Sequence, residues 1–170
     1  MATLQRLLNR ILLFVLCGVL MGTYCYQLIK SEGSCPLCIL QRLGMIGVAI
    51  GLLLNLRFGV KGEHYGLALL ASIFGFSVSL RQIGLHVSPQ FPSLSTSIFG
   101  YDLYAWSFLV FIGAILAIAV LLIIFVFTND KPVYSVWNRW DKSAFGLIFL
   151  VCFANVFTTF MECALSPCPG

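Results

Sequence analysis

The sequence predicts an all-α membrane protein that crosses the bilayer five times and forms a single integral-membrane domain over residues 1–170. Hydrophobic residues make up 60% of the chain and charged residues only 9%, which is too apolar for a soluble domain. Five apolar runs are long enough to span a bilayer as helices, at about 7–29, 37–56, 65–86, 103–127 and 143–162. Because these runs are continuous, and not short and alternating, they argue against a β-barrel.

The first two predicted helices differ in how they begin. The first follows Arg6 and Arg10, as the apolar region of a signal peptide would, but it continues to Ile29 without a small-x-small cleavage site. We therefore expect an uncleaved span. The second begins near Pro36, because a residue that lacks an N–H suits the first helical position. The short segment "RFGVKGEH", punctuated by two glycines, separates it from the third span.

The two later connections are longer. The third and fourth spans are joined by "VSPQFPSLSTSIFGYD", which is rich in Pro, Ser and Phe; we expect it to lie at the membrane surface, and docking of an extended partner is the alternative. The fourth and fifth spans are joined by "TNDKPVYSVWNRWDK", in which Pro132 breaks the helix. The tryptophans of this segment suit a membrane interface.

The net charge of +4 is better explained by membrane topology than by nucleic-acid binding. Seven basic residues lie before or at the start of the first span or in the second-to-third and fourth-to-fifth connections: Arg6, Arg10, Arg57, Lys61, Lys131, Arg139 and Lys142. By the positive-inside rule the N-terminus is cytoplasmic and, after five spans, the C-terminus is on the non-cytoplasmic side. Four cysteines then lie on the side of the membrane where disulfides persist: Cys35, Cys38, Cys163 and Cys168.

The start of the second span combines two thiols with an arginine. Pro36 favours an extended conformation at Cys35 and places Cys38 in the first helical turn, where unpaired N–H groups and the helix dipole favour a thiolate. Arg42 follows Cys38 by four residues, so the two share a helical face, with Gln41 close by. A guanidinium inside a span is costly without a partner, which makes Arg42 a functional-site candidate. Snorkelling of its charge to the membrane surface is the alternative.

A second polar group lies near the outer end of the third span, in "SLRQIGLH". Gln82 and His86 share a face at four-residue spacing, whereas Arg81 points away from His86. With Arg42 they predict a pocket below the outer surface for an amphiphilic ligand, although His86 could equally be an interfacial anchor. A quinone fits, because its carbonyl oxygens accept hydrogen bonds, its tail belongs in lipid, and it can take the electrons of a dithiol.

In these residues the chain resembles the DsbB family, the quinone-coupled disulfide bond formation proteins of bacterial inner membranes. The resemblance rests on "CPLCILQR", residues 35–42, and on the segment 81–86. It implies a four-helix bundle, here with a fifth transmembrane helix added, and ubiquinone or menaquinone from the membrane quinone pool as acceptor. It also implies that Cys38 lies next to the quinone and that Arg42 supports it. The expected electron donor is a periplasmic DsbA-like thioredoxin-fold dithiol oxidase.

The chain departs from the family in its second cysteine pair. Members usually carry that pair in the outer loop between spans three and four, where this chain has no cysteine. The C-terminal segment "ECALSPCPG" instead places Cys163 and Cys168 beyond the fifth span. We expect this tail to pass electrons from the partner to Cys35, with Cys38 released beside the quinone. If the tail holds a structural disulfide, the partner has to engage Cys35 directly.

Other readings of the same residues stay open. The four outer cysteines could bind zinc as thiolates, or the chain could be a structural membrane subunit with two ordinary disulfides. Electrons could also run outwards, which would make the protein a thiol reductant conduit. The vitamin K epoxide reductase family also pairs membrane helices with Cys-x-x-Cys, but its active pair lies at a late span. For the quinone site, Arg42 is the leading candidate, followed by Gln41, Arg81 and His86.

Overall fold

The chain folds into five long helices and, within the described residues, no strand. The computed structural model describes residues 2–30, 36–87, 100, 102–128 and 139–163. Its helices are α1 (Ala2–Lys30), α2 (Pro36–Phe58), α3 (Gly62–Val87), α4 (Leu103–Thr128) and α5 (Arg139–Cys163). All five are long and apolar enough to cross a membrane. The predicted all-α membrane fold is confirmed.

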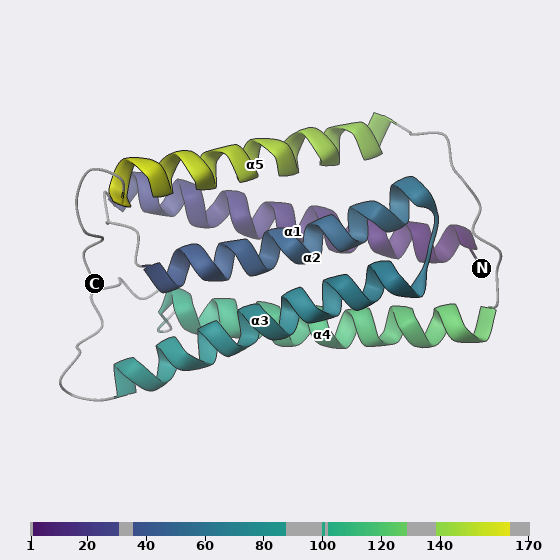
Figure 1. The fold of residues 1–170 in the computed structure, drawn as a ribbon, viewed down its shortest axis with the longest axis horizontal. Helices are drawn as coiled ribbons and strands as arrows, with labels where there is room; N and C mark the ends of the chain where they lie inside the picture. Colours follow the sequence, from purple (N-terminus) through teal and green to yellow (C-terminus); the bar gives the residue numbers. More distant parts are fainter. Residues whose placement is uncertain (1, 31–35, 88–99, 101, 129–138, 164–170) are drawn as a thin grey trace.

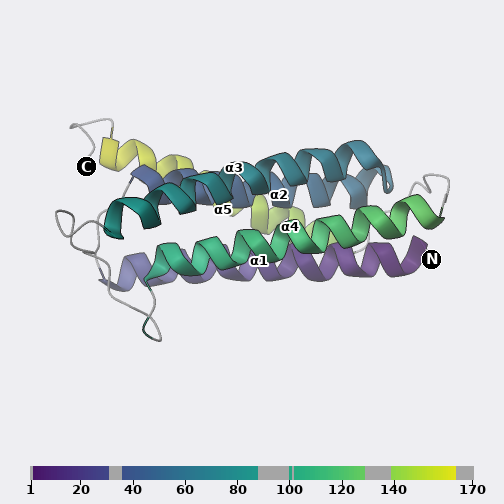
Figure 2. The same cartoon turned by 90° about the horizontal axis from the view of Figure 1, so that it is seen from below.

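The helices run along one common axis, with α2 at the centre (Figures 1 and 2). The most extensive packing joins α2 to α3 and α3 to α4, while α1 packs on α2 and α4. These four helices form a closed bundle. The fifth helix, α5, lies outside that bundle and packs on α1 and α2. The structure therefore has the predicted arrangement of four helices plus one.

The up-and-down order of the helices brings distant parts of the chain to the same end of the bundle. In Figure 1 the last turns of α1, α3 and α5 and the first turns of α2 and α4 all lie at the end opposite to the N-terminus. The described side chains of the predicted site come from this end, from the first turns of α2 and the last turns of α3. We call it the site end below.

Small residues allow α2 and α3 to approach closely. A Cβ added to Gly44 would lie 3.0 Å from the Cα of Gly75, and one added to Gly47 would lie 2.8 Å from the Cβ of Ala71. At Gly51 it would lie 2.8 Å from both the Cβ of Ala68 and the carbonyl oxygen of His64. Close approach through Gly and Ala is a common way for helices to pack in membranes.

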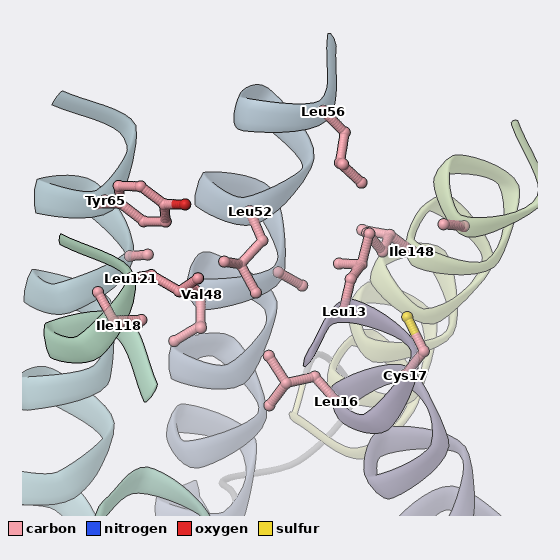
Figure 3. Close-up of a cluster of buried hydrophobic side chains, with 13 residues drawn as sticks. Leu13, Leu16, Cys17, Val48, Leu52, Leu56, Tyr65, Ile118, Leu121 and Ile148 are labelled. Atoms are coloured by element: carbon pink, nitrogen blue, oxygen red, sulfur yellow. The ribbon is translucent and has the colours of Figure 1, made fainter. Parts of the chain in front are cut away.

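Apolar side chains from all five helices fill the middle of the bundle (Figure 3). Leu13, Leu52 and Ile118 are fully buried there, and Ile148 brings α5 onto the same cluster. Large apolar side chains also cover much of the outer surface, for example Leu70, Leu116 and Phe149. In a membrane these outer side chains face lipid, so their exposure carries no cost.

Candidate active site

The thiol of the described site lies at the start of α2. This helix begins at Pro36, as predicted, and Cys38 is in its first turn and half-buried. Backbone N–H groups without a helical partner and the positive end of the helix dipole meet there. Cys35 and Cys168 lie outside the described residues. Of Cys163 the structure describes only the backbone, as the last residue of α5.

A row of amides connects Cys38 to the neighbouring helix. Gln82 of α3 directs its Nε2 at the Sγ of Cys38, at 3.6 Å, and its Oε1 accepts a hydrogen bond from Gln41 Nε2 at 2.7 Å. Gln41 is 3% exposed and Gln82 is 4% exposed. The pair satisfies its own polar groups across the α2–α3 contact, and it leaves an N–H donor facing the sulfur.

Arg42 points to the other side, towards α1. Its guanidinium carbon lies 4.3 Å from the centre of the Tyr24 ring, which is a cation–π contact. Its Nη2 donates to the Oε1 of Gln27 at 2.5 Å. Because Arg42 is only 8% exposed, the snorkelling alternative is not what the structure shows.

One nitrogen of the Arg42 guanidinium makes no described hydrogen bond. Nη1 of Arg42 is buried and has no hydrogen-bond partner within the described part of the chain. None of the described contacts of Arg42 is a carboxylate, so its charge is not neutralised there. A buried, unsatisfied cationic N–H is costly, and it fits an oxygen acceptor or an anion supplied from elsewhere.

His86 belongs to a neighbouring group at the same end. Its Nδ1 donates to the backbone carbonyl of Gln82 at 2.9 Å, and its ring stacks on Tyr104 of α4 at a centroid distance of 4.9 Å. The Tyr104 hydroxyl in turn donates to Asp102 at 2.5 Å. His86 is therefore next to the Gln82 backbone, and not among the described contacts of Cys38 or Arg42.

Arg81 takes no part in this arrangement. Its side chain is exposed, whereas the next residue, Gln82, is buried against α2. Successive residues of a helix point about 100° apart. The structure thus brings together Cys38, Gln41 and Gln82, places Arg42 beside them, and leaves Arg81 on the outer face of α3.

Three polar residues of the site were not among the sequence-based candidates: Tyr24, Gln27 and Asn155. The Tyr24 hydroxyl donates to Oδ1 of Asn155 on α5 at 2.8 Å, within the buried interior. Gln82 was noted in the sequence but not ranked as a site residue. A polar side chain inside an otherwise apolar span was the available signal in each case.

The first half of the chain is similar to known proteins. The family model described as "Disulfide bond formation protein DsbB" matches residues 5–95, which include α2 and α3. A protein named "Disulfide bond formation protein B" from Chromobacterium violaceum is 47% identical over 68 residues, 38% of this chain and 40% of the relative. One of the same name from Cupriavidus necator is 33% identical over 73 residues, 42% of this chain and 45% of the relative.

A third relative, "Disulfide bond formation protein B 1" from Pseudomonas fluorescens, is 36% identical over 94 residues, 52% of this chain and 53% of the relative. The chain thus spans about half the length of the curated relatives it matches, or less. No solved structure matches the chain.

Proposed function

Because the chain belongs to the DsbB family of disulfide bond formation proteins, we propose that it is a protein thiol:quinone oxidoreductase of the bacterial inner membrane. It reoxidises a periplasmic thioredoxin-fold dithiol oxidase of DsbA type and passes the electrons to membrane quinone. Five helices that can cross a bilayer agree with a multi-pass protein of that membrane. Its electron donor would come from the periplasm and its acceptor from the lipid.

One observation carries this proposal: the buried Nη1 of Arg42, which has no partner in the described structure, four residues after Cys38. A quinone head group presents carbonyl oxygens, and these are the acceptors that such an N–H lacks. Ubiquinone or menaquinone therefore fits the residues that are present. When bound, the quinone supplies the terminal oxidant, since it takes up two electrons and two protons to become a quinol.

The cysteines conduct the electrons by disulfide exchange. A thiolate of the partner attacks one sulfur of the Cys163–Cys168 disulfide and the partner's second thiol resolves the mixed disulfide, so that the partner is oxidised and the tail is reduced. One thiolate of the reduced tail then attacks Cys35 of a Cys35–Cys38 disulfide, which forms a mixed disulfide with Cys35 and releases Cys38 as a thiolate. The second tail thiol resolves the mixed disulfide, so that the tail disulfide forms again and Cys35 is left as a thiol. Each exchange moves two electrons.

The described side chains then act on that thiolate. The Nε2 of Gln82 lies at hydrogen-bonding distance from the sulfur, and the first turn of α2 adds its backbone N–H groups. Arg42 supplies positive charge for the thiolate and for the oxygen on which negative charge develops. Gln41 orients Gln82 through their hydrogen bond. Arg81 and His86 keep a lesser place in the proposal, since one is exposed and the other contacts the backbone of Gln82.

The thiol state of the four cysteines tests the electron route. Native membranes would be treated with a mass-tagging maleimide, with quinone present and with quinone depleted. We expect Cys35, Cys38, Cys163 and Cys168 to be oxidised with quinone and to accumulate as thiols without it. A thiol state that ignores quinone would disprove the oxidase function.

The same thiol tagging, followed over time after quinone is added, tests whether Arg42 takes part in the quinone site. We expect Arg42→Ala to lower the quinone-dependent reoxidation rate at limiting quinone by about ten- to a hundredfold, the cost of one charge-assisted hydrogen bond, while both disulfides still form with excess oxidant. Arg57→Ala is the matched control, because Arg57 lies at the other end of the same helix and is exposed. Unchanged quinone kinetics in Arg42→Ala would remove this residue from the site.

A further inference from the structure

The fifth helix reaches the site through a buried hydrogen bond. Asn155 of α5 accepts it from the Tyr24 hydroxyl of α1, with 2.8 Å between the two oxygens. Both side chains are 7% exposed, so the bond is shielded from lipid and water. An amide inside a span is costly unless it is satisfied, so this bond explains why α5 can carry Asn155 at this depth.

Several neighbours of Asn155 on α5 face away from the other helices. Phe153, Val156 and Phe157 are exposed on the outer surface. The Thr158 hydroxyl donates to the carbonyls of Ala154 and Asn155, within the same helix. Thr158 also has a side-chain hydrogen-bond contact with Tyr24, so Asn155 and Thr158 both link this part of α5 to α1.

Tyr24 also contacts Arg42, the arginine of the site. The Tyr24 ring lies 4.3 Å from the Arg42 guanidinium, and Gln27, one turn further along α1, accepts a hydrogen bond from Nη2. Tyr24 and Gln27 thus hold the guanidinium in one orientation, and this orientation sets the direction of Nη1. The hydroxyl is the end of the Tyr24 side chain furthest from the backbone. A hydrogen bond to it therefore restricts the movement of the whole ring.

We propose that Asn155 is a positioning residue for Arg42, acting through Tyr24, so that the fifth helix is a working part of the quinone site. This inference rests on the proposed function. It gives α5 a role although α1 to α4 already form a closed bundle: through Tyr24, α5 helps to orient the arginine of the site. Asn155 touches neither the thiols nor the quinone.

The test removes each end of the hydrogen bond separately. Tyr24→Phe keeps the ring under Arg42 but removes the donor, and Asn155→Leu removes the acceptor at similar volume. Initial rates would be measured with the reduced partner in excess and ubiquinone-1 varied, or menadione where the protein prefers a naphthoquinone. We expect KM for the quinone to rise about two- to tenfold in each variant, with kcat changed by less than about twofold. The double variant should resemble either single variant, because both substitutions break the same bond.

Two further variants separate positioning from plain stability. Asn155→Asp keeps an acceptor oxygen at the same place and should bring KM back to within about twofold of the unsubstituted protein. Asp141→Asn weakens a polar link between α1 and α5 that lies far from the site, where Arg10 Nε is 2.7 Å from Asp141 Oδ1. It should lower the melting temperature in detergent while leaving KM unchanged.

The outcomes distinguish this inference from the proposed function. If Tyr24→Phe and Asn155→Leu leave KM unchanged while Arg42→Ala raises it, the positioning role is wrong and the quinone site stands. The role is also wrong if the two variants lower only the melting temperature, as Asp141→Asn should. If Arg42→Ala has no effect on quinone kinetics either, the assignment of the site fails together with the inference.

Discussion

At the scale of single residues, the site depends on two neighbours on α2 that point to different helices. Gln41 contacts Gln82 on α3, whereas Arg42 contacts Tyr24 and Gln27 on α1. They follow Cys38 by three and four residues, so both lie within one turn of its thiol. The sulfur therefore has an amide donor from α3 beside it, while the cation of the next residue after Gln41 is held against α1.

Gln82 gives a prediction at this scale. Replacing it by alanine removes the donor that faces the Cys38 sulfur and leaves Gln41 without its acceptor. We expect alkylation of Cys38 by iodoacetamide in the reduced protein to slow by about tenfold, because the thiolate loses a hydrogen bond. The rate would be followed by mass spectrometry of the Cys38 peptide.

Ser79→Ala is the control for this experiment. Ser79 is also buried on α3, one turn earlier, and its hydroxyl donates to the carbonyl of Gly75 within the helix. Its removal should change the alkylation rate by less than about twofold. Equal rates in Gln82→Ala and in the unsubstituted protein would mean that the amide does not support the thiolate.

At the scale of helices, the contact between α2 and α3 brings Gln41 and Gln82 together. Small residues of α2 face small residues of α3 along most of this contact, and the amide pair follows at its site end. At Gly51 the near atoms include backbone atoms of α3, which cannot move aside for an added side chain as the end of a flexible side chain could.

Gly51 tests this contact. A methyl group at Gly51 would lie 2.8 Å from the His64 carbonyl oxygen and 3.0 Å from the Ala68 nitrogen, both backbone atoms. We expect Gly51→Ala to lower the free energy of unfolding by about 1 to 3 kcal/mol through overpacking. Denaturation in mixed micelles, followed by circular dichroism, would measure it.

Gly66→Ala provides the comparison for Gly51→Ala. Gly66 lies within α3, and a Cβ there would meet nothing within 4 Å. This substitution should be neutral or stabilise the protein by up to about 1 kcal/mol, because alanine favours a helix over glycine. If both variants lost the same stability, close approach of α2 and α3 would not be the reason.

At the scale of the whole molecule, the helix order collects the site at one end of the bundle. Polar contacts between helices also occur at the other end: Asn9 Nδ2 donates to the Tyr65 hydroxyl at 2.7 Å, and Arg10 pairs with Asp141. The distribution of basic residues predicts that this second end is cytoplasmic and the site end periplasmic. That orientation decides whether a periplasmic partner can reach the cysteines.

Fusions to alkaline phosphatase would test the orientation, since this enzyme is active only outside the cytoplasm. We expect a fusion after Gly170 to be active and a fusion after Asp130, between the fourth and fifth predicted spans, to be inactive. Immunoblots would show that both are made in equal amounts. The reverse pattern would place the cysteines on the reducing side and would rule out the proposed direction of electron flow.

A good part of the site could be predicted from local sequence. Helical spacing alone placed Cys38, Gln41 and Arg42 within one turn, and the structure places them so. Arg81 was ranked above Gln82 from the sequence, whereas the structure places Gln82 against Cys38 and leaves Arg81 exposed, because local spacing does not tell which face of α3 meets α2. The row of small residues at Ala68, Ser72, Gly75 and Ser79 is buried and leads to Gln82 on the same face, so this signal could have been used.

The sequence by itself determined the membrane class, the five spans and the thiol and arginine at the start of α2, because these depend on composition and on spacing within one helix. Only the tertiary structure decided which polar residues of other helices reach them: Gln82 from α3, Tyr24 and Gln27 from α1, and Asn155 from α5. Such contacts depend on how helices rotate and pack against one another. Interhelical packing joins residues as much as 131 positions apart, such as Tyr24 and Asn155, a relation that no local pattern contains.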